Sequence, residues 1–99
     1  MKNILTKKLI ERYSRQIVLK DVGPAGQKKI IKSKVLVVGA GGLGCPVIDY
    51  LTRAGVGNIG VIDHDKVNTS NIHRQSLYIS RDVGKYKVSV VKKKIKLIN

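Results

Sequence analysis

Three glycines at a fixed spacing are the residues that point most directly to a chemistry. Gly39, Gly41 and Gly44 follow a run of four apolar residues, 35–38, and fill the pattern G-x-G-x-x-G. In this pattern the first glycine permits a tight turn, the second lets a pyrophosphate approach the backbone, and the third allows close helix packing. Apolar residues at helical spacing continue through residues 43–54. The order strand, glycine turn, helix predicts a phosphate site at the N-terminus of that helix.

An acidic residue after a second apolar run strengthens this prediction. The run 58–62 ends at Asp63, which lies nineteen positions after Gly44 (63 − 44 = 19). Nucleotide-binding folds place an acid at about this distance to hold a ribose hydroxyl. Taken alone, the glycines could form an ordinary turn between strand and helix, and Asp63 could be a cap or a solvated strand end. The two features together favour nucleotide binding.

The remaining pattern predicts an α/β, Rossmann-like fold with a mostly parallel sheet and helices on both of its faces. Both strands are apolar enough to be buried on both faces, and residues 64–84 form a long polar loop. We expect an N-terminal helical segment, 1–33, followed by the first half of a nucleotide-binding domain, 34–99. The expected helices are 5–19, 24–32, 43–54 and one from about residue 86; the expected strands are 34–38 and 58–63.

The chain length predicts an incomplete sheet. A βαβ unit takes about 30 residues, so 99 residues suit the front half of a larger domain or a shortened relative of one. Apolar residues at helical spacing run through 88–98 and are followed by neither a glycine nor another cap signal. We therefore expect the apolar face of this last helix to be buried by self-association or by a second chain.

Charge and composition exclude several classes of function. Twenty Lys and Arg against six Asp and Glu give a net charge of +14, but the cations are scattered and mostly lysine, and aromatic residues for stacking are few. Specific nucleic-acid binding is therefore not expected. A single cysteine, Cys45, excludes an internal disulfide; it fits a packed position, although a helix N-terminus would also lower the pKa of its thiol. No apolar run is long enough to cross a membrane, and a cytoplasmic protein is expected.

Three further motifs resemble a known family. They are Arg12–Ile17 (RYSRQI), Asp63–Gln75 (DHDKVNTSNIHRQ) and Val83–Val88 (VGKYKV). In this order and spacing they resemble the N-terminal half of the MoeB/ThiF adenylyltransferases, which are similar to ubiquitin-activating enzymes. The resemblance covers nearly all of residues 11–99. It implies ATP- and Mg²⁺-dependent adenylation of the C-terminal glycine of a small ubiquitin-fold sulfur carrier or modifier, by a homodimer or with a complementing chain.

The resemblance also implies roles for single residues. Gly41 and Gly42 would lie against the ATP phosphates, and Asp63 would hold the ribose. A polar strip along the nucleotide, two phosphate-directed cations and an arginine that reaches into the partner subunit's site complete the set: Ser70, Asn71, Arg74, Lys87 and Arg15. Arg15, Arg74 and Lys87 would be the catalytic residues. The family's magnesium aspartate and its paired Cys-x-x-Cys zinc motifs would lie beyond residue 99, so no metal ligand is assigned and zinc is expected only in a longer form.

Other interpretations stay open from the residues alone. Arg74 and Lys87 could be surface cations, and Arg15 could pair with Glu11 on one helix face. Asp65 could bind magnesium or cap the turn that follows it.

His64 and His73 lack partners at metal-ligand spacing and read as polar loop residues. At the level of function, the chain could be the cofactor half of an NAD-dependent dehydrogenase, or a non-catalytic remnant that only binds nucleotide or a partner. The dehydrogenase alternative gives no reason for the three cations that the resemblance singles out.

Overall fold

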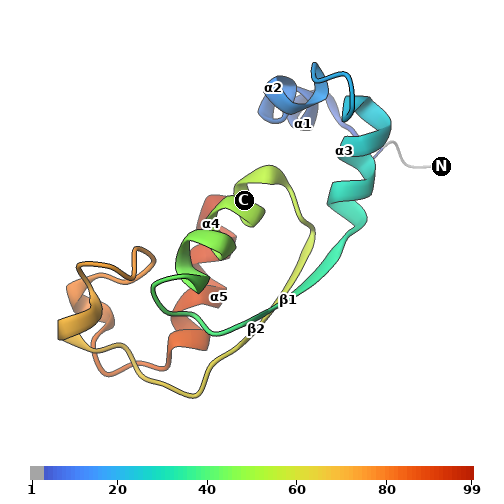
Figure 1. The fold of residues 1–99 in the computed structure, drawn as a ribbon. Coiled ribbons are helices and arrows are strands. Elements are labelled where there is room, and N and C mark those ends of the chain that lie inside the picture. Colours follow the sequence, from blue (N-terminus) through green and yellow to red (C-terminus); the bar gives the residue numbers. More distant parts are fainter. Residues whose placement is uncertain (1–3) are drawn as a thin grey trace.

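The structure, a computed structural model, describes residues 4–99 and consists of five α-helices, two strands and two 3₁₀ turns (Figure 1). The elements are α1 (Lys7–Arg12), α2 (Ser14–Ile17), α3 (Gly23–Lys32), β1 (Lys34–Val38), α4 (Gly44–Ala54), β2 (Asn58–Ile62), η1 (Thr69–Asn71), η2 (Ser80–Asp82) and α5 (Lys87–Ile98). None of the helices in this range has the length and hydropathy needed to cross a membrane.

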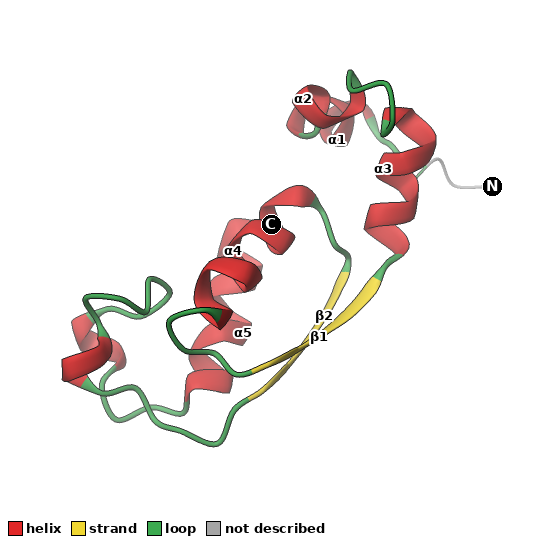
Figure 2. Ribbon diagram, viewed as in Figure 1, coloured by secondary structure: helices red, strands yellow, loops and turns green. Residues whose placement is uncertain are grey.

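The two strands form a parallel pair joined by the crossover helix α4 (Figure 2). The register runs from Lys34 opposite Asn58 to Val38 opposite Ile62. The first strand has the predicted bounds, and the second ends one residue earlier than expected. The Rossmann-like, parallel α/β class predicted from the sequence is confirmed.

Helices α4 and α5 both pack against the same face of this sheet. Val37, Ile48 and Val91 lie in one buried cluster with the inward side chains of both strands. Val90 and Val91 of α5 are therefore buried within the chain, whereas Ile95 and Ile98 are only partly buried. Burial of the rest of this face by self-association or by a second chain stays a prediction.

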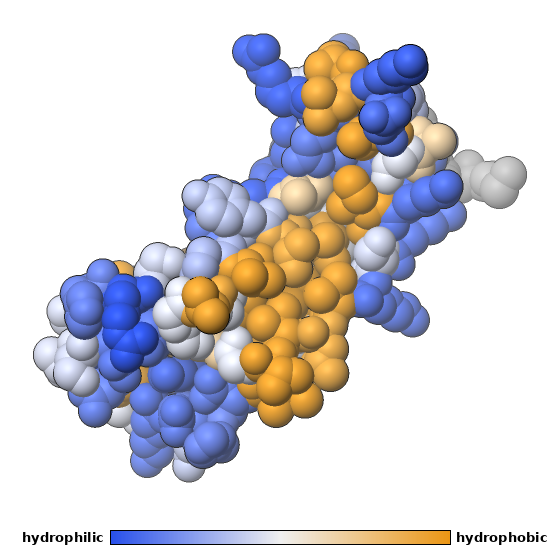
Figure 3. Space-filling view, viewed as in Figure 1, coloured by the Kyte–Doolittle hydropathy of each residue, from blue (hydrophilic) through white to orange (hydrophobic). Residues whose placement is uncertain are grey.

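The opposite sheet face carries Leu36, Val38 and Ile62, whose exposed fractions are 61%, 76% and 54%. A broad apolar area spans the middle of the molecule, where the sheet and α4 lie (Figure 3). No helix within residues 4–99 covers this face, so helices on both faces and strands buried on both faces are not found there.

The predicted helix over residues 5–19 is interrupted at Tyr13. Tyr13 has φ −102° and ψ 14°, and it separates α1 from α2. Its ring is 4% exposed, and its hydroxyl accepts a hydrogen bond of 2.7 Å from the side-chain amide of Asn99. The apolar side predicted for this segment is present, with Leu5 and Tyr13 both buried. Packing against the C-terminus of the chain thus overrides a continuous helical pattern.

Side-chain amides fasten the N-terminal helices to the end of α4. Gln16 and Gln27 each donate 3.0 Å hydrogen bonds to the carbonyl of Ala54, and Gln16 also donates to Gln27 over 2.6 Å. Asn99 donates to the carbonyl of Thr52 over 2.8 Å. We call Gln16, Gln27 and Asn99 the amide clasp. The donors of Gln16 and Gln27 satisfy the carbonyl of Ala54, which is one of those that the last turn of a helix leaves without an intrahelical partner. The carbonyl of Thr52 also accepts from the amide of Gly55.

Candidate nucleotide-binding site

The glycine turn between β1 and α4 has the geometry that its sequence predicts. Gly39 has φ +97°, a conformation that side chains rarely adopt. A Cβ at Gly44 would overlap the carbonyl oxygen of Gly39, so only glycine fits there. The tight turn and the close approach expected of the first and third glycines are both confirmed. Gly41 is less constrained, since a Cβ there would meet only the side-chain nitrogen of Gln75 at 3.8 Å.

The peptide groups of Ala40 hold this turn in place. The Ala40 amide donates 2.8 Å to a carboxylate oxygen of Asp63, while the Ala40 carbonyl accepts 2.6 Å from the Tyr78 hydroxyl and 3.4 Å from the Cys45 thiol. Ala40 is fully buried. Within residues 4–99 no acceptor is found for the backbone amides of Gly41 and Gly42. The turn therefore presents free donors at the N-terminus of α4, which suits an anion.

Asp63 connects the ends of the two strands. One oxygen of its carboxylate accepts from Ala40 and the other accepts 2.8 Å from the amide of Asp65. Burial alone would raise the pKa of Asp63. These two backbone hydrogen bonds, with the charge of Lys87, outweigh burial and lower the pKa. Asp63 thus acts as a cap for two backbone amides, which is the structural alternative that the sequence left open. Its contact with a ribose stays a prediction.

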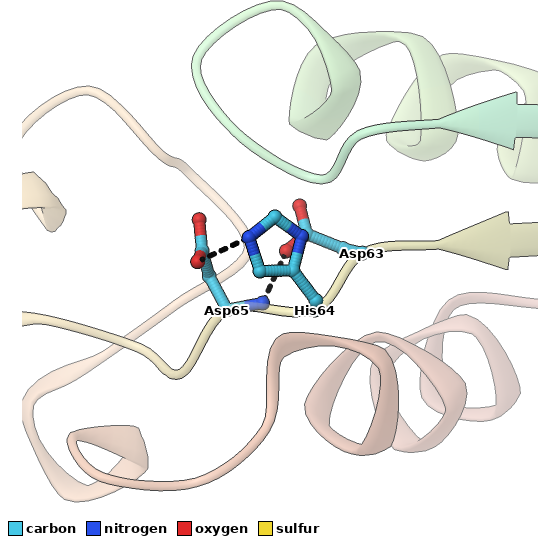
Figure 4. Close-up of side chains that lie close together, drawn as sticks. All are labelled: Asp63, His64 and Asp65. Atoms are coloured by element: carbon cyan, nitrogen blue, oxygen red, sulfur yellow. Dashed lines mark hydrogen bonds and ion pairs between the residues drawn. The ribbon is translucent and has the colours of Figure 1, made fainter.

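A histidine between two carboxylates follows β2 directly (Figure 4). His64 Nε2 lies 3.2 Å from a carboxylate oxygen of Asp65, and ligand atoms of Asp63, His64 and Asp65 all lie within 4.8 Å of one another. His64 thus has two carboxylates within reach, and its interpretation as a polar loop residue without a metal role stays a prediction. Its side chain is 96% exposed, and exposed groups of this kind are common without an ion. Asp63 caps the turn that leads to the Asp65 amide, and within residues 4–99 no backbone amide is found to donate to the side chain of Asp65.

The loop that contains η1 lies across the glycine turn. A Cβ at Gly42 would be 3.1 Å from a guanidinium nitrogen of Arg74, and Arg74 donates 3.0 Å to the side-chain oxygen of Asn71. The structure thus brings Gly42, Arg74 and Asn71 together, as the resemblance implied. Ser70 is exposed and bonds to Asn68 through both its amide and its hydroxyl, each over 3.0 Å.

Lys87 is a buried residue whose ammonium has no carboxylate partner among the residues that the structure describes. It is the first residue of α5, it is 4% exposed, and its ammonium lies 6.0 Å from the centre of the Tyr78 ring. No carboxylate of residues 4–99 lies within 4.0 Å of it, since the ion pairs found there join other residues. The alternative that Lys87 is a surface cation is therefore wrong. Because a buried charge is stable only when it is paired, this position suits an anion brought by a ligand.

Cys45 occupies the packed position expected for it. Its side chain is fully buried, and burial raises the pKa of its thiol. A raised pKa disfavours the thiolate, which is the reactive form. The thiol therefore packs in the core and donates a hydrogen bond to the Ala40 carbonyl.

Arg15 is not part of the constellation around the glycine turn. It lies exposed on α2, which together with α1 and α3 forms the end of the molecule away from the loops that follow β2 (Figure 1). No ion pair joins Arg15 to Glu11 within the part of the chain that the structure describes. Its role on a partner subunit stays a prediction.

Two buried residues of the site were not singled out from the sequence. Gln75 is 3% exposed and Tyr78 is 2% exposed, and both lie against the glycine turn. Gln75 ends one of the three motifs, so its position gave a signal. Tyr78 lies outside all three motifs, and nothing in its local sequence indicates a bond to Ala40, 38 positions earlier.

The fold and the free donors define the class of protein: a Rossmann-like α/β chain with unbonded backbone amides at its glycine turn. Residues 13–99 match the model of the ThiF family. The chain belongs to the ThiF family, as its motifs indicated.

Two similar curated proteins are named as adenylyltransferases. The chain is 50% identical over 94 residues to a "Sulfur carrier protein adenylyltransferase" of Thermus thermophilus, covering 95% of this chain and 35% of the relative. It is 50% identical over 101 residues to "Adenylyltransferase and sulfurtransferase MOCS3" of Anopheles gambiae, covering 99% of this chain and 23% of the relative. The chain thus spans about a third or less of the length of these relatives.

Solved structures agree with this fold. PaaA superimposes with a TM-score of 0.88 at 37% identity, over 100% of this chain and 33% of PaaA. E. coli MccB, in a structure with AMPCPP and MccA, superimposes with a TM-score of 0.81 at 34% identity, over 98% of this chain and 29% of MccB. E. coli tRNA N6-threonylcarbamoyladenosine dehydratase, TcdA, solved in complex with ATP, gives a TM-score of 0.88 at 29% identity, over 98% and 39%.

Proposed function

We propose that this chain provides the ATP-binding part of an adenylyltransferase that activates the C-terminal carboxylate of a ubiquitin-fold sulfur carrier. The observation that carries the proposal is Lys87, a residue only 4% exposed with no carboxylate within 4.0 Å among residues 4–99, beside a glycine turn with free amides. Relatives named as sulfur carrier protein adenylyltransferases support it, as does a solved relative in complex with ATP.

Adenylation of a carboxylate requires cations and hydrogen-bond donors directed at the phosphates, and the proposed site provides both. The carboxylate attacks the α-phosphorus of ATP, the bond to the bridging oxygen breaks, and pyrophosphate leaves. Both reactants are anionic and negative charge grows on the leaving group, so fixed cations and amides stabilise the transition state. Lys87, Arg74 and the amides of Gly41 and Gly42 are the donors for this task. A terminal carboxylate is already ionised at pH 7, so the site needs no general base.

Titration of the purified chain tests this proposal against a dinucleotide cofactor. We expect ATP with Mg²⁺ to bind at least tenfold tighter than NAD by isothermal titration calorimetry, because a triphosphate brings more charge to Lys87 and Arg74. Equal or tighter binding of NAD would favour the dehydrogenase alternative. No binding of either nucleotide would contradict the proposal as a whole.

We further propose that Arg15 acts on the site of a second copy of the chain in a homodimeric enzyme. Its support is its exposed position on α2, at the end of the molecule away from its own glycine turn. Mixing Arg15→Ala subunits with Lys87→Ala subunits in the complete enzyme should restore part of the adenylation activity, since hybrid dimers regain one intact site. Activity no higher than that of either variant alone would count against this role.

The remaining roles stay predictions. These are the ribose contact of Asp63, the nucleotide contacts of Ser70 and Asn71, the use of Mg²⁺, the cytoplasmic location and the boundary of the N-terminal segment at residue 33. The sulfur carrier itself is proposed from what the relatives' names say of those proteins.

A further inference from the structure

The side chain of Gln75 is buried beside the glycine turn with hydrogen-bonding capacity to spare. It is 3% exposed, and its carbonyl oxygen is buried without a hydrogen-bond partner among residues 4–99. Its nitrogen lies 3.8 Å from the position that a Cβ would occupy at Gly41. An unpaired buried amide destabilises a protein, and native structures rarely keep one without a reason.

The neighbours of Gln75 show which part of the turn it faces. Arg74 lies against Gly42, Gln75 against Gly41, and Tyr78 donates to the carbonyl of Ala40. This short segment therefore follows the glycine turn residue by residue. Gln75 therefore lies at the middle glycine of the turn, next to the guanidinium group of Arg74. On its other side lies the peptide of Ala40, whose amide and carbonyl already form hydrogen bonds.

We propose that the side-chain amide of Gln75 is a further phosphate-binding group of this site, which rests on the proposed function. Its NH₂ nitrogen already faces the turn at Gly41, and no acceptor for it is found among residues 4–99, so it can donate to a phosphate oxygen. Its ligand is the phosphate chain of a nucleotide, next to the free amides of Gly41 and Gly42. The NH₂ group has no acceptor in the described chain because, in this proposal, its acceptor is a phosphate oxygen of the ligand.

A second buried glutamine provides a matched comparison. Gln27 is fully buried like Gln75, but it donates to Ala54 and accepts from Gln16. Methionine has nearly the shape of glutamine and no amide. Gln75→Met removes an unpaired group, and Gln27→Met removes a paired one.

The test combines calorimetric titration with ATP and with inorganic triphosphate and thermal unfolding of the full chain. For Gln75→Met we expect both ligands to bind about tenfold more weakly, which is the loss of one hydrogen bond to a charged group. Its Tm should equal or exceed that of the parent. For Gln27→Met we expect a lower Tm and unchanged affinity.

Each outcome separates the inference from the proposed function. Unchanged ATP and triphosphate affinity in Gln75→Met, with normal binding by the parent, would overturn the role of Gln75 and leave the ATP site standing. A fall of Tm together with affinity would show that Gln75 only supports the fold, which also overturns it. A parent chain that binds neither ligand would remove the proposed function itself.

Discussion

The two ends of the molecule differ in whether particular side-chain amide and ammonium groups find partners within the chain. At the N-terminal end the amide clasp pairs the side chains of Gln16, Gln27 and Asn99 with carbonyls at the end of α4 and with Tyr13. At the glycine-turn end Lys87 has no carboxylate partner and the oxygen of Gln75 has no donor among residues 4–99.

This difference separates polar groups that maintain the fold from polar groups that are available to a ligand. Pairing satisfies a buried donor or acceptor and contributes to stability. Leaving a buried cation and an amide unpaired lowers the stability of the chain alone, and a ligand that pairs them regains that free energy on binding. The contrast between the ends therefore supports the proposed site independently of any motif.

Lys87→Met should show the contrast most strongly. We expect ATP affinity to fall by about a hundredfold, because a buried charge-assisted contact to phosphate is lost. The free energy of unfolding without ligand should stay the same or rise, since the unpaired charge is removed. Calorimetry and thermal unfolding measure the two effects.

The control for this variant is Lys96→Met, which removes an exposed lysine of the same helix. It should change neither ATP affinity nor stability by more than a few tenths of a kcal/mol. A loss of ATP affinity in Lys96→Met equal to that in Lys87→Met would mean that net charge, not the placed ammonium, attracts the nucleotide.

Asp63→Asn should have a smaller effect, and one that depends on pH. The carboxylate accepts two backbone amides, so the substitution should cost about 1–2 kcal/mol of unfolding free energy at pH 7. The pKa of Asp63 is lowered in the folded chain, so its stabilisation is present above its unfolded pKa of about 3.9. That stabilisation disappears as the pH falls through the folded pKa.

Thermal unfolding of the parent and of Asp63→Asn should therefore differ at neutral pH and converge in acid. Asp49→Asn serves as the control, because Asp49 forms an ion pair with the exposed Arg53, and such pairs contribute little. A difference between parent and Asp63→Asn that stays constant down to the lowest pH would contradict the role of the ionised carboxylate.

A structural feature could be predicted from the sequence when the residues that determine it are close together along the chain. The bounds of β1 and the turn at Gly39 follow from an apolar run next to glycines, which is local information. The break at Tyr13 depends on Asn99, 86 positions away. The bond from Tyr78 to Ala40 spans 38 positions.

Burial is also a property of the folded chain. The sequence motif contained Lys87 and Gln75, but their burial without partners depends on how α5 and the η1 loop pack around the glycine turn. The apolar pattern of the strands, in turn, cannot show which of their faces the helices of this chain cover.

The most direct test is a titration of the isotopically labelled chain with ATP, followed by the NMR signals of backbone and side-chain amides. We predict that the backbone amides of Gly41 and Gly42 and the side-chain NH₂ group of Gln75 shift with one common Kd. The side-chain NH₂ groups of Gln16 and Gln27 should stay in place, because their partners are already present. Shifts of the amide clasp as large as those of the glycine turn, or silence at Gly41 and Gly42, would contradict the account.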